Sequence, residues 1–327
     1  MAETESQLDN EIAHYRLLTY SLNTKRSYSS YHKSYISFCV QMGYSPVPVT
    51  QIVLCRYAAF LARRLCFASI KKYLTIVRLL HLEAGLSNPL KENWFLDTVL
   101  KGISRDKGKA VHRKLPITPT ILLAIKARLD LSTPLHAVFW AASLVAFFGF
   151  LRKANLLPPS VAGFQPSKHL TRRDFLFTPD GIFLQIRWSK TIQCGERVLH
   201  APLPRLLRHP LCPVEAILRA FLLTRGAPSE GPAFLYWEQG AFRPLLPAKF
   251  ISLLKSHLSA LGLNPQHYSG HSFRRGAATW ALQNGLPGET IKILGDWRSD
   301  AYLAYLSLDL ADKISSVRKF SDNLPTT

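Results

Sequence analysis

The chain has 327 residues, and its 41 Lys and Arg against 21 Asp and Glu give a formal net charge of +20 at pH 7. Apolar residues make up 47% of the sequence, which excludes an intrinsically disordered protein, and the length suits two domains of ordinary size. The excess of positive charge indicates a polyanionic partner. Nucleic acid is the first candidate, and a basic surface that serves only solubility is the alternative.

The five cysteines are scattered and form no CxxC pair, so the sequence predicts neither a disulfide framework nor a zinc site, and a reducing compartment suits them. The start of the chain is acidic and polar, unlike a secretory signal peptide. The most apolar run, 137–151, is shorter than the roughly 20 residues that cross a bilayer. It therefore predicts a buried helix, and we expect no membrane association.

Residues 1–106 have helical periodicity throughout, which predicts four or five short helices. The expected helices cover residues 23–42, 49–61, 69–84 and 94–103. Asn23 and Thr24 can cap the first of these, and Gly43 ends it. Basic side chains on the outer faces of these helices suit a DNA clamp, with a solvated surface as the alternative for each of them. The candidates for DNA contact are Lys25, Arg26, Lys71, Lys72 and Arg78.

The polar, charged stretch 104–109 separates this helical block from the next periodic segment, and we assign 107–117 as the linker. In the second domain, 118–327, helices are expected at 118–129, 135–151, 214–223, 249–261 and from 273 onward, with breaks at 285–287 and 295. Between them, three short runs of β type are bounded by turn signals and predict a small antiparallel sheet. These runs are 175–177, 181–188 and 197–201.

Four cationic residues and a tyrosine follow one another through the second domain. Arg152 closes the apolar helix, where a guanidinium without an anionic partner is costly. Lys190 is expected at the hairpin between the second and third β runs. His271 and Arg274, three apart at the start of a helix, project to one side and suit a phosphate. Tyr305 comes last.

Arg, Lys, His-x-x-Arg and Tyr in this order resemble the tyrosine recombinase (phage-integrase-like) family. The stretch 23–39 also looks like the opening of that family's N-terminal core-binding domain, so the resemblance covers most of the chain. It implies a mainly α, SAM-like core-binding domain at 1–106 and a mixed α/β catalytic domain, mostly helical with a small antiparallel sheet, at 118–327. The sequences of segments 149–152, 189–191 and 297–302 are most similar to those of eukaryotic mobile-element recombinases of the Crypton and DIRS-like type.

The resemblance implies a site-specific recombinase or integrase that works through a 3′-phosphotyrosyl intermediate without metal, ATP or other cofactor. Two guanidiniums, Arg152 and Arg274, would bind the nonbridging phosphate oxygens with bidentate hydrogen bonds. Tyr305 would attack phosphorus as the nucleophile. The resemblance assigns protonation of the departing 5′ oxygen to Lys190, and His271 would donate or accept a proton near the phosphate.

Two tyrosines compete for the role of nucleophile. Tyr302 and Tyr305 are three apart on one expected helix, and only Tyr305 lies ten residues after Gly295, as in the family pattern. Asp296 stands where the family usually has His or Trp. The following Trp297 is therefore expected to supply the supporting hydrogen bond and to complete the set of site residues.

A second departure is Asn155, three residues after the first arginine, where the family often has an acidic residue. The resemblance also implies double-stranded DNA as the partner, with Arg275 among the contacts, and a homotetramer on DNA that is a monomer or dimer when free. A helix at 310–320 would dock onto a neighbouring subunit. The eukaryotic character of the resemblance points to the nucleus.

Two alternatives stay open. A type IB topoisomerase shares this chemistry and relaxes supercoils as a monomer. A domesticated DNA-binding protein would keep the fold without recombining, although a pure binder has no need of a phenol at this place. The sequence contains no Gly-x-Ser-x-Gly, phosphate-loop or dinucleotide-binding glycine signature, which argues against other catalytic classes.

Overall fold

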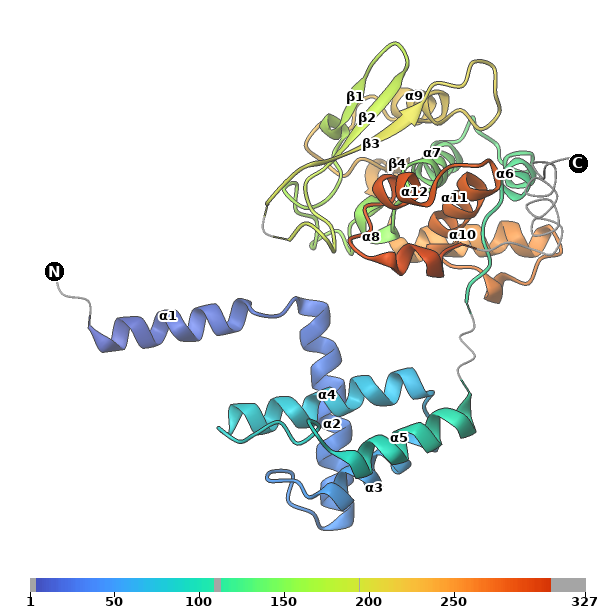
Figure 1. The fold of residues 1–327 in the computed structure, drawn as a ribbon. Coiled ribbons are helices and arrows are strands. Elements are labelled where there is room, and N and C mark those ends of the chain that lie inside the picture. Colours follow the sequence, from blue (N-terminus) through green and yellow to red (C-terminus); the bar gives the residue numbers. More distant parts are fainter. Residues whose placement is uncertain (1–3, 109–112, 194, 307–327) are drawn as a thin grey trace, which may run out of the picture. The chain divides into compact units, whose positions relative to one another are not determined.

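The computed structural model of the chain describes residues 4–108, 113–193 and 195–306. The chain divides into two compact units, Met1–His112 and Arg113–Thr327, each with its own apolar core (Figure 1). The boundary between them lies inside the predicted linker, 107–117. In its described part the first unit is helical, whereas the second combines helices with small antiparallel sheets. This confirms the predicted fold class.

The first unit has five helices in its described part. They are α1 (Glu5–Leu18), α2 (Leu22–Met42), α3 (Gln51–Ala62), α4 (Phe67–Glu83) and α5 (Trp94–Lys107). Ser21 and Thr50 cap α2 and α3, because each side-chain oxygen accepts a hydrogen bond from a backbone N–H of the first turn. The cap of α2 therefore lies two residues before the predicted Asn23. Gly43, in the left-handed conformation, ends α2 as predicted.

The core of the first unit forms where α2 packs against α4 and α3 against α5. Tyr35 and Tyr57 are fully buried there, with their ring centroids 5.0 Å apart. Helix α5 continues through Lys107, so most of the polar stretch 104–109, which was expected to separate the helical block from the next segment, is helical. Arg105 and Lys107 suit the last helical turn, because positive charge is favourable near a helix C-terminus.

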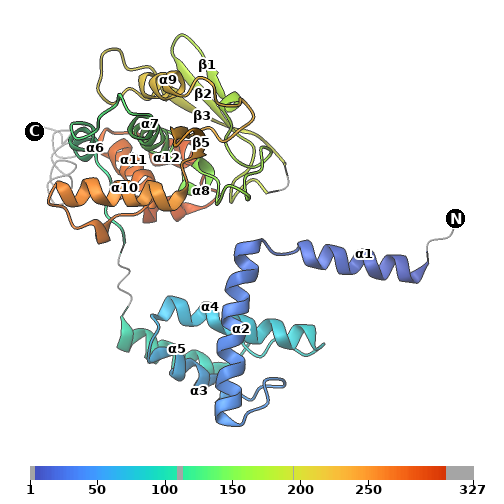
Figure 2. The same ribbon diagram turned by 180° about the vertical axis from the view of Figure 1, so that it is seen from behind.

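The second unit is built around α7 (Pro134–Phe148), in which every residue from Ala137 to Phe147 is buried. Around it lie α6 (Pro119–Lys126), α8 (Lys153–Leu156), α9 (Pro213–Leu223), α10 (Pro247–Ala260), α11 (His271–Gln283) and α12 (Gly288–Leu294). Seen from behind in Figure 2, α10 lies in front of α11, and Phe250 packs on Phe273 between them. None of the helices in the described part of the chain is long and apolar enough to cross a membrane.

A three-stranded antiparallel sheet, in the order β1-β2-β3, packs beside α7 and α9. Its strands are β1 (Phe175–Phe177), β2 (Gly181–Ile186) and β3 (Leu199–Pro204). The first strand agrees with the prediction. The second ends two residues early, because Arg187 turns away to pair with Asp174, and the third begins and ends later than predicted. The loop between β2 and β3 carries Lys190.

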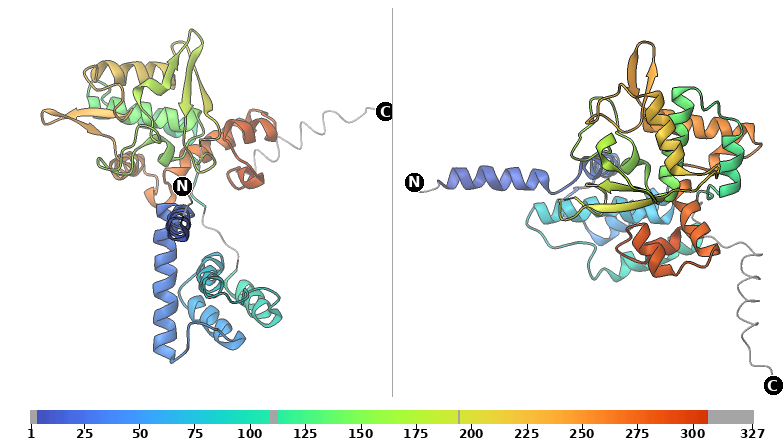
Figure 3. Two further views of the ribbon diagram at one scale, coloured as in Figure 1. Left: turned by 90° about the vertical axis from the view of Figure 1, so that its left-hand side faces the viewer. Right: turned by 90° about the horizontal axis from the view of Figure 1, so that it is seen from above.

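A second hairpin, β4 (Leu235–Glu238) and β5 (Ala241–Pro244), projects from the body of this unit in both views of Figure 3. It was not predicted from the sequence, because the strands have only four residues each. Gln239 and Gly240 both have positive φ at its turn, the pattern of a tight two-residue hairpin. Further short 3-10 helices include Arg172–Asp174, Pro265–His267 and Asp300–Ala304.

Candidate active site

Arg152 lies in the connection between α7 and α8. Helix α7 ends at Phe148, not at Leu151 as predicted, and Phe150 then adopts a left-handed φ of 51°. The chain returns to an extended conformation at Arg152, which is the N-cap residue of α8. The Arg152 side chain is half-buried and makes no hydrogen bond or ion pair with the described residues. A guanidinium in that situation is suited to an anionic ligand.

His271 is the first residue of α11, as predicted. The start of this helix approaches α8 closely, because a Cβ atom on Gly270 would lie 3.0 Å from the Lys153 side chain. Desolvation, followed by the positive charges of Arg152, Lys153, Arg274 and Lys190, lowers the pKa of His271 below 6.5. The cationic residues predicted from the sequence therefore converge on one imidazole.

Arg274 is buried one turn further along α11, with 2% of its surface exposed. Its guanidinium donates hydrogen bonds to the carbonyl oxygens of Phe150 and Gly295, the latter at 2.5 Å. Burial, and then the charge of Arg152, lower the pKa of Arg274 to about 9, while Tyr305 acts in the opposite direction. The guanidinium therefore stays cationic at neutral pH, and its Nε has no partner among the described residues.

The Arg274 guanidinium stacks on the Trp297 ring, with the guanidinium carbon 3.7 Å from the ring centroid. This packing requires glycine at position 295, since a Cβ there would lie 1.6 Å from a ring carbon of Trp297. The indole Nε1 is buried and has no partner among the described residues, so the expected hydrogen bond is not made in this structure. Trp297 supports the site through stacking.

The two competing tyrosines occupy different environments. Tyr302 is buried against Trp297, and its hydroxyl lies 2.7 Å from the position of a Cβ on Gly288, so it packs in the core. Tyr305 is half-buried, and its ring lies 5.5 Å from the guanidinium carbon of Arg274. The two tyrosines were expected on one helix. The structure has a 3-10 helix at Asp300–Ala304 instead, which contains Tyr302, and Tyr305 follows it. This arrangement favours Tyr305 as the nucleophile.

Lys190 is exposed at a turn closed by backbone hydrogen bonds between Ser189 and Ile192. Asn155 holds the start of this turn, because its side-chain amide donates to the carbonyl oxygen of Trp188 at 3.3 Å. The amide at position 155 thus connects the helix that follows Arg152 with the Lys190 loop.

The sequence and the fold were compared with those of known proteins, and no family model matches the chain. The chain is 25% identical over 275 residues to an integrase/recombinase xerD homolog of Selenomonas ruminantium, which covers 82% of this chain and 76% of the relative. The structure of the XerH site-specific recombinase bound to a palindromic difH substrate is similar with a TM-score of 0.65 at 14% identity, covering 98% of this chain and 86% of that one. A lambda integrase dimer bound to a COC′ core site gives 0.59 at 16% identity, covering 93% and 95%.

The chain therefore has the fold of tyrosine recombinases and integrases, and its sequence is similar to that of one such protein. The proteins to which it is similar are integrases and site-specific recombinases, which is the class of enzyme that the sequence resemblance predicts. The comparisons do not separate the branches of the family.

Five of the six basic residues predicted to contact DNA lie on helices α2 and α4. Lys25 and Arg26 are exposed on α2, and Lys71 and Lys72 are exposed on α4, which packs against α2. Arg78, also on α4, is half-buried. All five belong to the first unit.

Arg275, the sixth predicted DNA contact, lies in the candidate active site. Its guanidinium carbon is 5.9 Å from the centroid of the Tyr305 ring. Desolvation and then the charge of Arg113 lower its pKa, and Tyr305 raises it. Arg275 was not predicted to belong to the site, although its position next to Arg274 was a usable signal.

Further polar residues of the second unit were not recognised in the sequence. They are Asp174, Thr191, Glu196, Arg197 and Arg298. They bind loops to one another through polar contacts between residues as many as 107 positions apart. No local spacing marks such pairs, so only the fold reveals them.

Proposed function

We propose that the protein is a site-specific DNA recombinase that cleaves and rejoins strands through a 3′-phosphotyrosyl intermediate. The observation that carries this proposal is the position of the Tyr305 ring beside the Arg274 and Arg275 guanidiniums, at the same site where Arg152, Lys190 and Arg274 act on His271. Such an excess of positive charge beside a phenol suits a phosphate diester and its attack by tyrosine.

Arg152 and Arg274 would bind the nonbridging oxygens of the phosphate. Arg274 uses one N–H of each terminal nitrogen for the carbonyls of Phe150 and Gly295, which leaves the second N–H of each terminal nitrogen for Tyr305 and a ligand. Its burial against Trp297 fixes the plane of the guanidinium before DNA binds. Fixed donors stabilise charge that develops in the transition state without reorganisation.

Proton transfer in this proposal uses His271 and Lys190. The Tyr305 oxygen attacks phosphorus, its proton passes to His271 or solvent, and the bond to the 5′ oxygen breaks as Lys190 protonates that oxygen. Because the pKa of His271 is lowered, the imidazole is neutral at pH 7 and can accept a proton. A 5′ hydroxyl from another strand then reverses the steps and releases Tyr305, so the energy of the phosphodiester is conserved.

The finer proposals rest on the sequence resemblance. We propose a eukaryotic mobile-element recombinase of the Crypton or DIRS-like type, acting in the nucleus as a homotetramer on two double-stranded DNA sites. The resemblance is carried by segments 149–152, 189–191 and 297–302. The helix expected at 310–320 for contact with a neighbouring subunit lies outside the described residues.

Covalent trapping tests the proposal. A pool of nicked duplexes with a randomised site would be incubated with the protein. Cleavage near the nick releases a short fragment that carries the 5′ hydroxyl, and loss of this fragment prevents religation. Wild type and Tyr302→Phe should both give a protein–DNA adduct that survives denaturation, and the selected sequences would identify the site. Tyr305→Phe should give none. An equal yield of adduct from Tyr305→Phe would contradict the assignment, and relaxation of plasmids without site preference would favour the topoisomerase alternative.

A further inference from the structure

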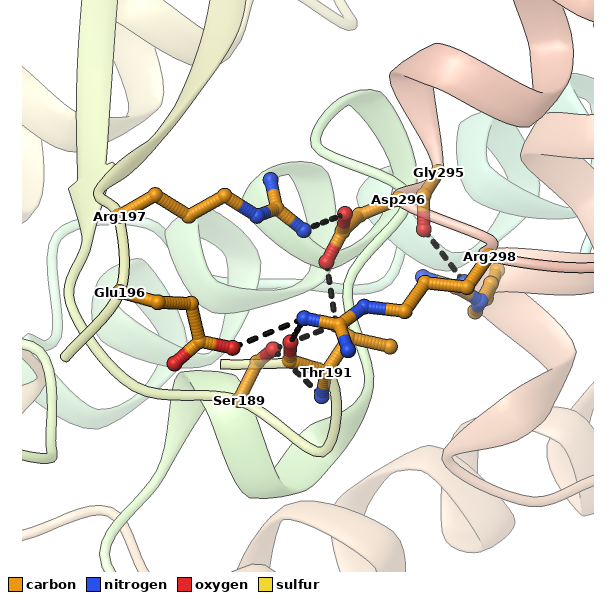
Figure 4. Close-up of polar contacts among 8 residues, drawn as sticks. Ser189, Thr191, Glu196, Arg197, Gly295, Asp296 and Arg298 are labelled. Carbon is orange, nitrogen blue, oxygen red and sulfur yellow. Dashed lines mark hydrogen bonds and ion pairs between the residues drawn. The ribbon is translucent and has the colours of Figure 1, made fainter. Parts of the chain in front are cut away.

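Five residues join the Lys190 loop to the segment that follows α12, and we call this set the hairpin clasp: Thr191, Glu196, Arg197, Asp296 and Arg298 (Figure 4). Asp296 accepts a hydrogen bond from the Thr191 hydroxyl with one carboxylate oxygen and pairs with Arg197 through the other. Arg298 donates to the carbonyl oxygen of Thr191 and, at 2.8 Å, to Glu196. Both sides of each contact come from the second unit.

On the loop side, the hairpin clasp is attached directly beside Lys190. Thr191 is its neighbour in sequence, and the Thr191 backbone N–H and hydroxyl both contact the Ser189 hydroxyl, at 3.0 and 2.8 Å. Ile192, which closes the same turn through its backbone, is fully buried. A contact made at Thr191 therefore determines where the Lys190 backbone lies.

On the other side, Asp296 lies between two residues that contact Arg274 or Tyr305. The carbonyl of Gly295 accepts a hydrogen bond from Arg274, and the Trp297 ring packs 5.3 Å from that of Tyr305. Asp296 itself has a φ of 51°, a left-handed conformation that Asp and Asn adopt more readily than most residues. Its side chain is only 12% exposed, so this carboxylate is held by its partners in one position.

We propose that Asp296 is a positioning residue that aligns Lys190 with the phosphate attacked by Tyr305. This inference rests on the proposed function, because it assigns a role in the same reaction. The departure from the family pattern at position 296 then has a chemical purpose: the carboxylate connects the proton donor for the leaving oxygen to the segment that carries the nucleophile.

A pair of substrates separates this role from a merely structural one. In one, the scissile phosphate has its normal 5′ oxygen, and in the other a 5′ bridging sulfur replaces that oxygen. The thiolate leaves without a proton, so it does not need Lys190. Asp296→Asn keeps a residue suited to the left-handed backbone and removes the charge. Since misplacement of a catalytic group by about 1 Å can cost about 100-fold in rate, we expect Asp296→Asn to cleave the oxygen substrate about 10- to 100-fold more slowly than wild type.

The sulfur substrate should restore cleavage by Asp296→Asn to within about threefold of wild type, as it should for Lys190→Ala, whereas Arg274→Ala should stay defective on both substrates. Arg173→Gln is the control, because it removes a more exposed ion pair, with Glu230, elsewhere on the unit. It should cleave both substrates at the wild-type rate. Equal slowing of Asp296→Asn on both substrates, or no slowing on either, would overturn the inference.

Arg197→Gln tests the hairpin clasp from the loop side, on a side chain that is 39% exposed, so the substitution does not disturb the core. It should give the same selective defect on the oxygen substrate, and the double variant with Asp296→Asn should be no slower than the slower single variant, because both remove one interaction. Additive defects would contradict the inference. Failure of the proposed function would be distinct, since wild type would then form no adduct with either substrate.

Discussion

At the residue scale, the candidate active site depends on a glycine that allows two large side chains to meet. Gly295 leaves room for the Trp297 ring, on which the Arg274 guanidinium stacks and against which Tyr305 packs. A tyrosine in the family's position is thus only part of the requirement. The surroundings of the tyrosine decide which of two candidates can reach a phosphate.

Gly295→Ala tests this packing. The added methyl group would overlap the Trp297 ring, so we expect a loss of about 1–3 kcal/mol in the free energy of unfolding, together with slower DNA cleavage. Gly102→Ala is the control, because Gly102 lies within helix α5 with open space around it, and Ala is the better helix former there. Urea unfolding of both variants measures the difference; an unchanged stability for Gly295→Ala would contradict the described packing.

His271 gives the site a predicted dependence on pH. Its pKa is lowered below 6.5, so the neutral imidazole that accepts a proton is present at pH 7 and is lost as the pH falls through the lowered value. Cleavage by the wild type should therefore decline on the acidic side of pH 6.5 and stay level between pH 7 and 8. In His271→Gln this acidic decline should disappear while the overall rate falls by about 10²-fold or more. Single-turnover rates across this pH range provide the measurement.

At the element scale, most helices could be predicted because their signals are local. Periodic apolar residues, and Gly43 as a terminator, act within a few positions along the chain. The end of α7 could not be predicted in this way, because the left-handed turn at Phe150 is set by packing against Trp297 and by the hydrogen bond from Arg274. The end of β2 was missed for a similar reason, since Arg187 turns toward a distant carboxylate.

That carboxylate, Asp174, anchors the base of the Lys190 hairpin. It is 1% exposed and accepts hydrogen bonds from the backbone and hydroxyl of Thr171, at 2.8 and 3.0 Å, as well as from Arg187. Asp174→Asn replaces an accepting oxygen by an amide donor, so we expect a loss of about 1–3 kcal/mol in stability and slower cleavage of the oxygen substrate. Thermal unfolding and single-turnover cleavage measure the two effects. Wild-type values in both would show that the hairpin does not need this anchor.

At the scale of the whole molecule, the charge of +20 and the two units are the features that sequence alone identified best. Net charge and apolar content are sums over the whole sequence, so an error in the predicted bounds of one helix or strand does not change them. The candidate site was predicted in its main groups, Arg152, Lys190, His271, Arg274 and Tyr305, from their order along the chain. The ion pair and hydrogen bond of Asp296 were not predicted, because they depend on how loops that are distant in sequence meet.

The basic residues of the first unit lead to a prediction about DNA affinity. Replacing the exposed Lys71 and Lys72 together by Ala should weaken DNA binding and reduce the slope of log affinity against log salt by about 1 for each phosphate that is no longer neutralised. Lys91→Ala is the control, because this exposed lysine is already paired with Glu92 at 3.0 Å. Titrations of duplex DNA at several salt concentrations supply the slopes. An unchanged slope for the double variant would remove α4 from the DNA interface.

The central claim is that Tyr305, and not its buried neighbour Tyr302, forms the covalent link to DNA. The most direct measurement is mass spectrometry of the trapped adduct after digestion of both the protein and the DNA. Residues 299–306 contain both tyrosines, so fragmentation of that peptide assigns the nucleotide remnant to one of them. A remnant on Tyr305 is the predicted result, and a remnant on Tyr302 or on any other side chain would contradict the account.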